Sequence, residues 1–384
     1  MVGWSYWERK IYFDQLDVVI VGAGFVGLSV GISLLEKNPQ QKVLIIERGF
    51  IPHGASTRNA GFACFGSAGE LADDLSKRSA EEVFGLFAKR YAGIRKLLQR
   101  TGPSEIEFRP GGGYELFYPE EESLISHETL KQLNEGIEAY TGLKNYFFEP
   151  PESLIKSSWP SFGKMLCNDH EACIHPLKTL QLLTKMFQQA GGQILYGFEL
   201  STWKEMEDGV MMVRPDGLEF MTQQLMFCVN GFAKRYFPDI MVKAARNSVM
   251  ILQTDRAKEL NGCYHVDRGY LYFRAIDAHH ILLGGGRHWD LEGEYQDNFL
   301  MNPMIRNKLI EFAEQYILNG QSYTITDEWT GIMGLGPVKS PIVQMVSSRV
   351  GVAVRMGGMG VALASLTGEE AAELLYQNQR KLRF

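Results

Sequence analysis

Three closely spaced glycines near the start of the chain form a pattern suited to binding phosphate. Gly22, Gly24 and Gly27 read as GxGxxG, in which the first glycine allows a tight turn and the second lets a pyrophosphate approach the backbone. The third brings a following helix close to the preceding strand, so that N–H groups at the helix N-terminus face the phosphates. Glu47 stands about 20 residues further on, where an acid can accept hydrogen bonds from ribose hydroxyls. The pattern predicts a dinucleotide site, and the acid disfavours the 2′-phosphate of NADP.

A loop of small residues with one arginine in its middle is the second candidate for chemistry. Residues 53–66 read HGASTRNAGFACFG and carry a single formal charge, Arg58. So little side-chain bulk suits a backbone that an anion approaches closely. A tight turn whose arginine meets a nearby carboxylate is the alternative. Because an NAD domain would normally need only a helix here, we interpret the dinucleotide as FAD, with this loop over its pyrophosphate and ribityl chain.

The elements that would position these groups are a strand, a helix and a second strand. Residues 17–21 are a short β-branched run, typical of a buried strand in a parallel sheet. Leu28, Ile32 and Leu35 follow at helical spacing, and residues 43–46 form the next apolar run, which ends at Glu47. This order of strand, glycine turn, helix, strand and acid is what raises GxGxxG above a chance match.

The motifs together resemble a known family. Residues 22–27, residues 47–49 and the run GASTRNAGF resemble the FAD-binding segments of the D-amino-acid oxidase superfamily, which includes glycine oxidase, sarcosine oxidase and related amine dehydrogenases. The resemblance extends over nearly the whole chain, since four later segments also match the pattern of the family. These segments are residues 171–197, 224–238, 269–288 and 350–375.

The resemblance implies an α/β fold in which a Rossmann-like FAD-binding domain is interleaved with a mixed-sheet α+β substrate domain. A chain of 384 residues exceeds one ordinary core, so two domains are expected. We expect the FAD-binding domain to use residues 1–84, 171–240 and 337–384. The substrate domain would then use residues 85–170 and 241–336.

The residues expected around the cofactor come from the glycine turns, the acid and the arginine-containing loop. They are Gly22, Gly24, Phe25, Val26, Gly27, Glu47, Arg48, Ser56, Thr57, Arg58, Asn59, Ala60, Gly61, Leu200, Asn230, Gly231, Arg355, Gly357, Gly358, Met359, Gly360 and Val361. We expect FAD to be held non-covalently, because the cysteine that sarcosine oxidases use for attachment corresponds to a methionine here.

The substrate pocket departs from the family pattern. Members of the family often carry an arginine for the substrate carboxylate in a pattern like G-x-R-P, and Met333 stands at that position. A buried carboxylate needs a cation, so either another cation replaces the arginine or the substrate has no carboxylate there. The replacement candidates are Arg355, which enters the last glycine turn, then Arg274 and Lys339, and with less support Arg287.

One predicted strand completes the list of substrate-pocket candidates. In GYLYFRA, alternation puts Tyr270, Tyr272 and Arg274 on one face. That face either lines the substrate cavity or meets solvent, and Arg274 belongs to a more general Tyr-x-x-x-Arg pattern that is compatible with a structural role. The four candidates are Tyr270, Arg274, Met333 and Arg355.

The predicted function is oxidation of a C–N bond of an amine or amino acid by hydride transfer to the flavin, giving an imine that hydrolyses. Oxygen or a carrier would then accept the electrons. Two alternatives stay open: oxidation of a hydroxy acid or polyol, because one flavin platform also oxidises C–OH bonds, and a flavin-binding protein with little or no turnover.

Composition and the distribution of charged, cysteine and apolar residues argue against several other classes of protein. A net charge of −6 gives no basic field for nucleic acid. Five scattered cysteines without a CxxC pair predict reduced thiols and no metal site. No apolar run is long enough for a transmembrane segment, and the first residues lack the apolar core of a secretion signal. We therefore expect a cytoplasmic enzyme whose partner is a small-molecule substrate.

Overall fold

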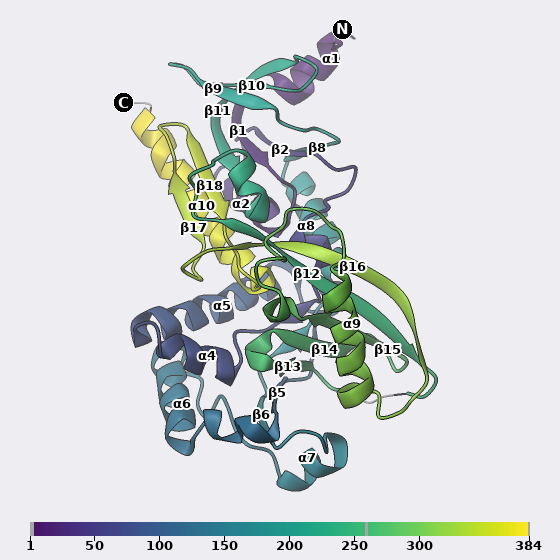
Figure 1. Cartoon of the computed structure of the whole chain (residues 1–384). Helices are drawn as coiled ribbons and strands as arrows, with labels where there is room; N and C mark the ends of the chain where they lie inside the picture. The colour runs from purple at the N-terminus through teal and green to yellow at the C-terminus, as the bar shows by residue number, and fades with distance from the viewer. Residues whose placement is uncertain (1–3, 258–259, 383–384) are drawn as a thin grey trace.

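The computed structural model describes residues 4–257 and 260–382, and in this part of the chain two large sheets dominate (Figure 1). The first has eight strands. Its main path runs in the order β17 (Ile342–Met345), β18 (Val350–Val354), β11 (Glu219–Phe227), β1 (Leu16–Val21), β2 (Val43–Glu47) and β8 (Gln193–Tyr196), and β10 (Val210–Val213) and β9 (Thr202–Glu205) extend from β11.

The centre of this first sheet is parallel. β1 pairs in parallel with β11 and β2, and β2 pairs in parallel with β8. Every residue of β2 is buried, as expected for strands covered on both faces. Helices α2 (Phe25–Lys37), α5 (Ala80–Thr101), α8 (Pro176–Gln189) and α10 (Gly360–Leu382) pack beside it, with α10 against both α2 and α5. This is the Rossmann-like half that the sequence predicts.

The second sheet is mixed and has seven strands. Their order is β16 (Tyr323–Leu335), β12 (Lys243–Thr254), β15 (His280–Gly285), β14 (Leu271–Ala275), β13 (Cys263–Val266), β5 (Gly113–Phe117) and β6 (Lys164–Asn168). Only β13 and β5 pair in parallel. Helix α9 (Pro303–Phe312) and the π-helix η7 (Ala313–Ile317) bury apolar side chains against this sheet. A small three-stranded sheet joins β3 (Phe62–Ala63), β7 (Ala172–Cys173) and β4 (Arg109–Pro110).

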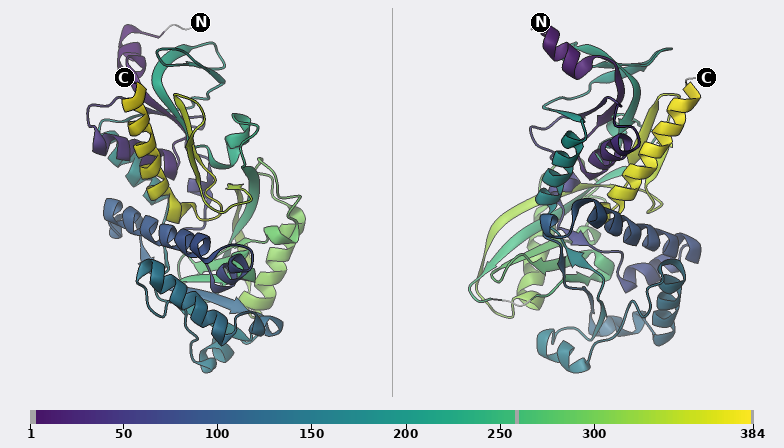
Figure 2. Two further views of the ribbon diagram at one scale, coloured as in Figure 1. Left: turned by 90° about the vertical axis from the view of Figure 1, so that its left-hand side faces the viewer. Right: turned by 180° about the vertical axis from the view of Figure 1, so that it is seen from behind.

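The remaining helices make the other connections. They are α1 (Tyr6–Glu8), η1 (Arg9–Phe13), α3 (Ala55–Arg58), α4 (Ala68–Leu75), η2 (Ser104–Ile106), η3 (Pro119–Leu124), α6 (His127–Thr141), α7 (Glu152–Ser158), η4 (Asn230–Arg235), η5 (Asp267–Gly269) and η6 (Arg287–Trp289). Both ends of the described chain lie at one end of the molecule, opposite α6 and α7 (Figure 2). None of the helices in the described residues is long and apolar enough to cross a membrane.

Strand membership alternates between the two sheets along the chain, but the proposed domain boundaries stay a prediction. β1 and β2 belong to the first sheet, β5 and β6 to the second, β8 to β11 to the first, β12 to β16 to the second, and β17 and β18 to the first. The expected strand over residues 270–274 begins one residue later, because Asp267 and Arg268 have left-handed backbone (φ 51° and 58°) and form a turn before it. Tyr270 therefore lies in this turn and not on the strand.

Candidate active site

A cavity of about 950 Å³ lies between the two large sheets. One side is lined by the glycine turn after β1, the end of β2 and the start of α10. The other side is lined by β12, β14 and β16, so the two halves of the fold meet across it. Cavities at such junctions are the usual place for a cofactor and its substrate.

The first glycine turn is packed so closely that a larger residue would not fit. Gly22 has φ 106°, and a Cβ there would lie 2.8 Å from the carbonyl oxygen of Cys228. A Cβ at Gly24 would lie 2.9 Å from the hydroxyl of Ser56, which accepts a hydrogen bond from the N–H of Phe25 at 2.9 Å. Gly24, Phe25 and Val26 line the cavity, so the N-terminus of α2 faces it, which fits a pyrophosphate.

Glu47 shapes the adenosine end of the cavity. It is buried at the end of β2, where one carboxylate oxygen accepts from the N–H of Ala23 and the other from the N–H of Gly49, both at 3.0 Å. The carboxylate lines the cavity, and each oxygen keeps a second acceptor position. These residues fit the ribose of a dinucleotide.

Arg58 joins its loop to the second sheet. Its guanidinium donates to the carbonyl oxygen of Thr330 at 3.0 Å and lies 4.5 Å from the ring centroid of Phe299. In the opposite direction, the indole N–H of Trp329 donates to the carbonyl oxygen of Arg58 at 3.0 Å. Partial burial lowers the pKa of Arg58. Arg58 also lines the cavity, and no carboxylate of the described residues pairs with it, so it fastens the loop to β16.

Most of the predicted cofactor residues line the cavity. Five do not: Gly27, Thr57, Gly61, Gly231 and Arg355. The first four are sequence neighbours of residues that do line it. Thr57, for example, donates a hydrogen bond to the carbonyl oxygen of Pro52 at 2.8 Å. Those that line the cavity are Gly22, Gly24, Phe25, Val26, Glu47, Arg48, Ser56, Arg58, Asn59, Ala60, Leu200, Asn230, Gly357, Gly358, Met359, Gly360 and Val361.

The last glycine turn meets the end of β16. The N–H of Gly357 donates to the carbonyl oxygen of Gly334 at 3.0 Å, and a Cβ at Gly358 would lie 3.7 Å from the sulfur of Met333. The sulfur of Met359 lies 3.9 Å from that of Cys64. Met333 and Met359 both line the cavity near the N-terminus of α10 and contribute apolar side chains there.

Two predicted pocket arginines are corrected by the structure. Arg274 is buried and donates to the carbonyl oxygen of Ala60 at 2.7 Å, and Arg355 donates to that of Ser340 at 2.8 Å. Neither is among the residues that line the cavity. Both satisfy backbone carbonyls instead of facing a substrate. Tyr270 and Met333 do line the cavity.

The sequence did not single out a hydrogen-bonded pair on the cavity wall. Tyr272 on β14 accepts a hydrogen bond from the side-chain amide of Asn247 on β12 at 2.7 Å, and both line the cavity. The pair is possible because β15 has Gly284 between them, where a Cβ would lie 2.6 Å from the Tyr272 hydroxyl. Burial raises the pKa of Tyr272, so its hydroxyl stays protonated. Alternation placed Tyr272 on a face that could line the cavity, but nothing in the sequence indicated Asn247 as its partner.

A buried acid and histidine lie along the same row of the sheet. His265 on β13 is opposite Tyr272 and beside Glu115 on β5, and its Nε2 lies 2.9 Å from a carboxylate oxygen of Glu171. Burial alone would lower the pKa of His265, but Glu171 outweighs it and the pKa is raised. Burial also raises the pKa of Glu115, to about 7. His265 lines the cavity, and alternation in the sequence did not reveal it.

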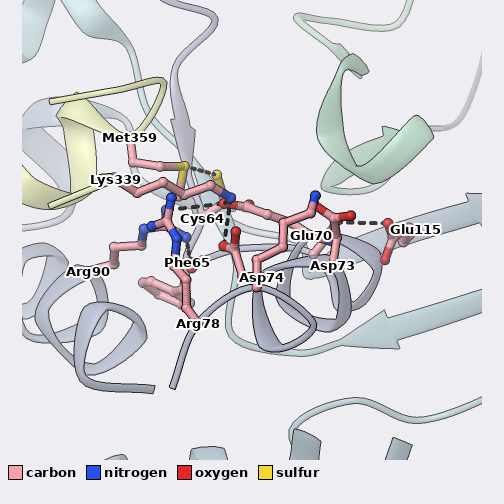
Figure 3. Close-up of polar contacts among 12 residues, drawn as sticks. Cys64, Phe65, Glu70, Asp73, Asp74, Arg78, Arg90, Glu115, Lys339 and Met359 are labelled. Atoms are coloured by element: carbon pink, nitrogen blue, oxygen red, sulfur yellow. Dashed lines mark hydrogen bonds and ion pairs between the residues drawn. The ribbon is translucent and has the colours of Figure 1, made fainter. Parts of the chain in front are cut away.

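A charged cluster closes another side of the cavity (Figure 3). Glu70 accepts from Arg90 at 3.2 Å and from Lys339 at 2.8 Å, and Lys339 also donates to Asp74 at 2.6 Å. Burial favours neutral Glu70, but the two cations outweigh it and lower its pKa to about 2. Lys339 already holds two carboxylates, so it is a poor replacement for the missing carboxylate-binding arginine.

One group of side chains has donor atoms suited to a metal. Atoms of Cys64, Glu171 and His265 lie within 4.8 Å of one another, and all three residues are buried. The short contact between His265 and Glu171 already explains that pair without an ion. All five cysteines are free thiols, as the sequence predicts. The absence of a metal stays a prediction.

Comparison with known proteins identifies the family. The family described as FAD-dependent oxidoreductase (DAO) matches residues 17–374. The chain belongs to the DAO family. Its cofactor is accordingly FAD, and it is an oxidoreductase, as the glycine turns and Glu47 predict. The α/β fold of a DAO enzyme is thereby confirmed.

Relatives of this DAO protein differ in their substrates. It is 22% identical to the probable oxidoreductase OrdL of Haemophilus influenzae, over 100% of this chain and 92% of that protein. It is 25% identical to L-2-hydroxyglutarate dehydrogenase of Escherichia coli, over 57% of this chain and 48% of that protein.

Solved structures share the fold. L-proline dehydrogenase from P. horikoshii aligns with a TM-score of 0.73 at 15% identity, over 94% of each chain. Glycine oxidase from Geobacillus kaustophilus aligns with a TM-score of 0.73 at 17% identity, over 94% of this chain and 95% of that one. At such identities these structures support the architecture alone.

Proposed function

We propose that this DAO enzyme oxidises a C–N bond of an amine or amino acid. The observation that carries the proposal is a cavity that is continuous from the dinucleotide turn to a wall of hydrogen-bonding side chains. FAD, when bound, supplies the acceptor for the hydride. Structural neighbours titled glycine oxidase and iminodiacetate oxidase act on C–N bonds by name, which supports this choice.

The chain's own residues would bind and orient the substrate. Asn247 and Tyr272 present an amide and a hydroxyl to the cavity, and these polar groups can fix the orientation of a small molecule. Met333 and Met359 offer a flexible apolar surface beside the last glycine turn, which excludes water there. Close positioning of this kind is the main contribution a protein makes to hydride transfer by a cofactor.

Oxidation of a hydroxy acid is the second candidate. It is favoured by the match to L-2-hydroxyglutarate dehydrogenase, although the chain spans about half of that protein. The same cavity wall could orient an alcohol as well as an amine, because a hydroxyl and an amide both donate and accept hydrogen bonds.

Anaerobic mixing separates the two candidates. The FAD-loaded protein is mixed with amino acids, secondary amines, polyamines and hydroxy acids, and the flavin absorbance is followed. Bleaching by amines or amino acids supports the proposal, whereas bleaching by hydroxy acids alone replaces it with the second candidate. Readmitting air then shows whether oxygen or a carrier accepts the electrons.

We further propose that FAD is non-covalent and that the enzyme works in the cytoplasm. Free thiols at all five cysteines suit a reducing compartment. Acid precipitation should release the flavin into the supernatant, and flavin that stays with the pellet would show a covalent link. Cell fractionation tests the location.

A further inference from the structure

Besides the charged cluster around Glu70 and Lys339, two further regions of the cavity wall differ in character. Beside the last glycine turn, where the flavin ring is expected, the wall carries Met333 and Met359. Across the second sheet, the wall carries Tyr270 with Arg268 and Arg287. Tyr270 is 37% exposed, so this second region, the cationic mouth, opens toward solvent.

The two regions are far apart on the sheet. Met333 lies on β16, whereas Tyr270 directly precedes β14, and β12 and β15 run between these strands. Neighbouring strands are about 4.8 Å apart, so three steps separate the two backbones by roughly 14 Å. A cation at the mouth cannot replace the family's arginine at position 333, but it can reach the other end of a longer substrate.

Arg287 is free to bind such an anion. Its guanidinium lies 5.4 Å from the ring centroid of Tyr270, and no acceptor among the described residues forms a hydrogen bond or ion pair with its side chain. Two other cations that line the cavity are already engaged: Arg268 lies 3.7 Å from Asp73, and Lys77 lies 2.6 Å from the same carboxylate. Arg287 thus supplies an unused planar donor set in the cavity wall, the type of group that binds carboxylates in two places at once.

We propose that Arg287 binds a carboxylate of the substrate that is separated by a spacer of several bonds from the carbon that is oxidised. The spacer lies along the sheet, and the reacting carbon lies near Met333. This rests on the proposed function and narrows it: the enzyme acts on a chain-like amine with a distal acid, and an acid next to the reacting carbon is not required.

Unreactive probes test the subsite on FAD-loaded protein. Calorimetric titration compares acetate, hexanoate and hexanamide on the full chain, in preparations whose absorbance shows bound FAD. We expect hexanoate to bind more tightly than either acetate or hexanamide, because only hexanoate combines a carboxylate with an apolar chain. Arg287→Gln should weaken hexanoate about 10- to 100-fold and leave hexanamide unchanged. Arg287→Lys should recover part of the loss, because it keeps the charge.

A matched control is Arg306→Gln, which removes an arginine that pairs with Glu328 outside the cavity and should not change binding. The inference is overturned if hexanoate binds equally well to Arg287→Gln, or if it does not bind to the wild type. Failure of the proposed function is seen separately, as absence of bleaching by any amine.

Discussion

Arg274 shows how a single buried residue can hold backbone in place. Its Nε donates to Ala60 and its Nη2 donates to Ile174 at 3.4 Å, which ties the arginine-containing loop to the segment before α8. We expect Arg274→Met to lower the free energy of unfolding by about 2–4 kcal/mol, because two buried carbonyls lose their donor. Urea unfolding measures this, with Arg306→Met as an exposed control. A large rise in the KM of Arg274→Met without loss of stability would instead show that Arg274 binds the substrate.

Glu115 makes stability depend on pH. Burial raises its pKa to about 7, above the value near 4.5 of an unfolded glutamate, so the folded state binds the proton more tightly. Its contribution to stability is full below about pH 4.5 and is lost as the pH rises through 7, at a cost of up to about 3 kcal/mol. His265, whose pKa is also raised, acts in the same direction above about pH 6.5.

Glu115→Gln removes the carboxyl part of this dependence. We expect the wild type to melt at a lower temperature at pH 8 than at pH 6, and the variant to show a smaller difference. Thermal unfolding followed by circular dichroism at both values measures it. An unchanged difference would mean that Glu115 titrates near its ordinary pKa.

At the scale of elements, the loop around α3 depends on β16 for its position. Arg58, Trp329 and Thr330 exchange two hydrogen bonds at 3.0 Å across the cavity edge. We expect Arg58→Ala to raise the Kd for FAD about tenfold or more, because the loop loses a charged hydrogen bond. FAD content after extensive dialysis measures this, with the exposed Arg109→Ala as control. Equal retention by both variants would contradict it.

Local signals explain which elements could be predicted from the sequence. The glycine turn and Glu47 lie within short segments whose patterns are diagnostic, and each lies where it was expected. The directions of Arg274 and Arg355 could not be predicted in this way. Alternation assigns a residue to a face of a strand, but it does not tell what packs opposite that face.

The missed pairings depend on contacts between distant parts of the chain. Glu70 and Lys339 are 269 positions apart, and Asn247 and Tyr272 belong to strands separated by β15. Although Lys339 and Tyr272 were candidates, nothing in either local segment indicates the partner. The first pair depends on the packing of α4, and the second depends on the strand order of the second sheet.

At the scale of the whole molecule, the cavity lies where the two halves of the fold meet, so a cofactor bound there contacts both. A ligand that binds only the folded state stabilises it by about 2.7 kcal/mol at a concentration of 100 times its Kd. We therefore expect removal of FAD to lower the melting temperature of the full chain and readdition to restore it. NADP should have no such effect, because Glu47 disfavours its 2′-phosphate. Equal stabilisation by NADP would contradict the assignment of Glu47 to the ribose hydroxyls of the cofactor.

The most direct test is the flavin content of the protein itself. The full chain is incubated with FAD, separated from free cofactor by gel filtration, and its visible spectrum and flavin-to-protein ratio are measured. We predict a yellow protein with equimolar FAD, and loss of that flavin in Gly24→Val, whose side chain would occupy the space beside Ser56. A colourless wild-type protein after this treatment would contradict the account.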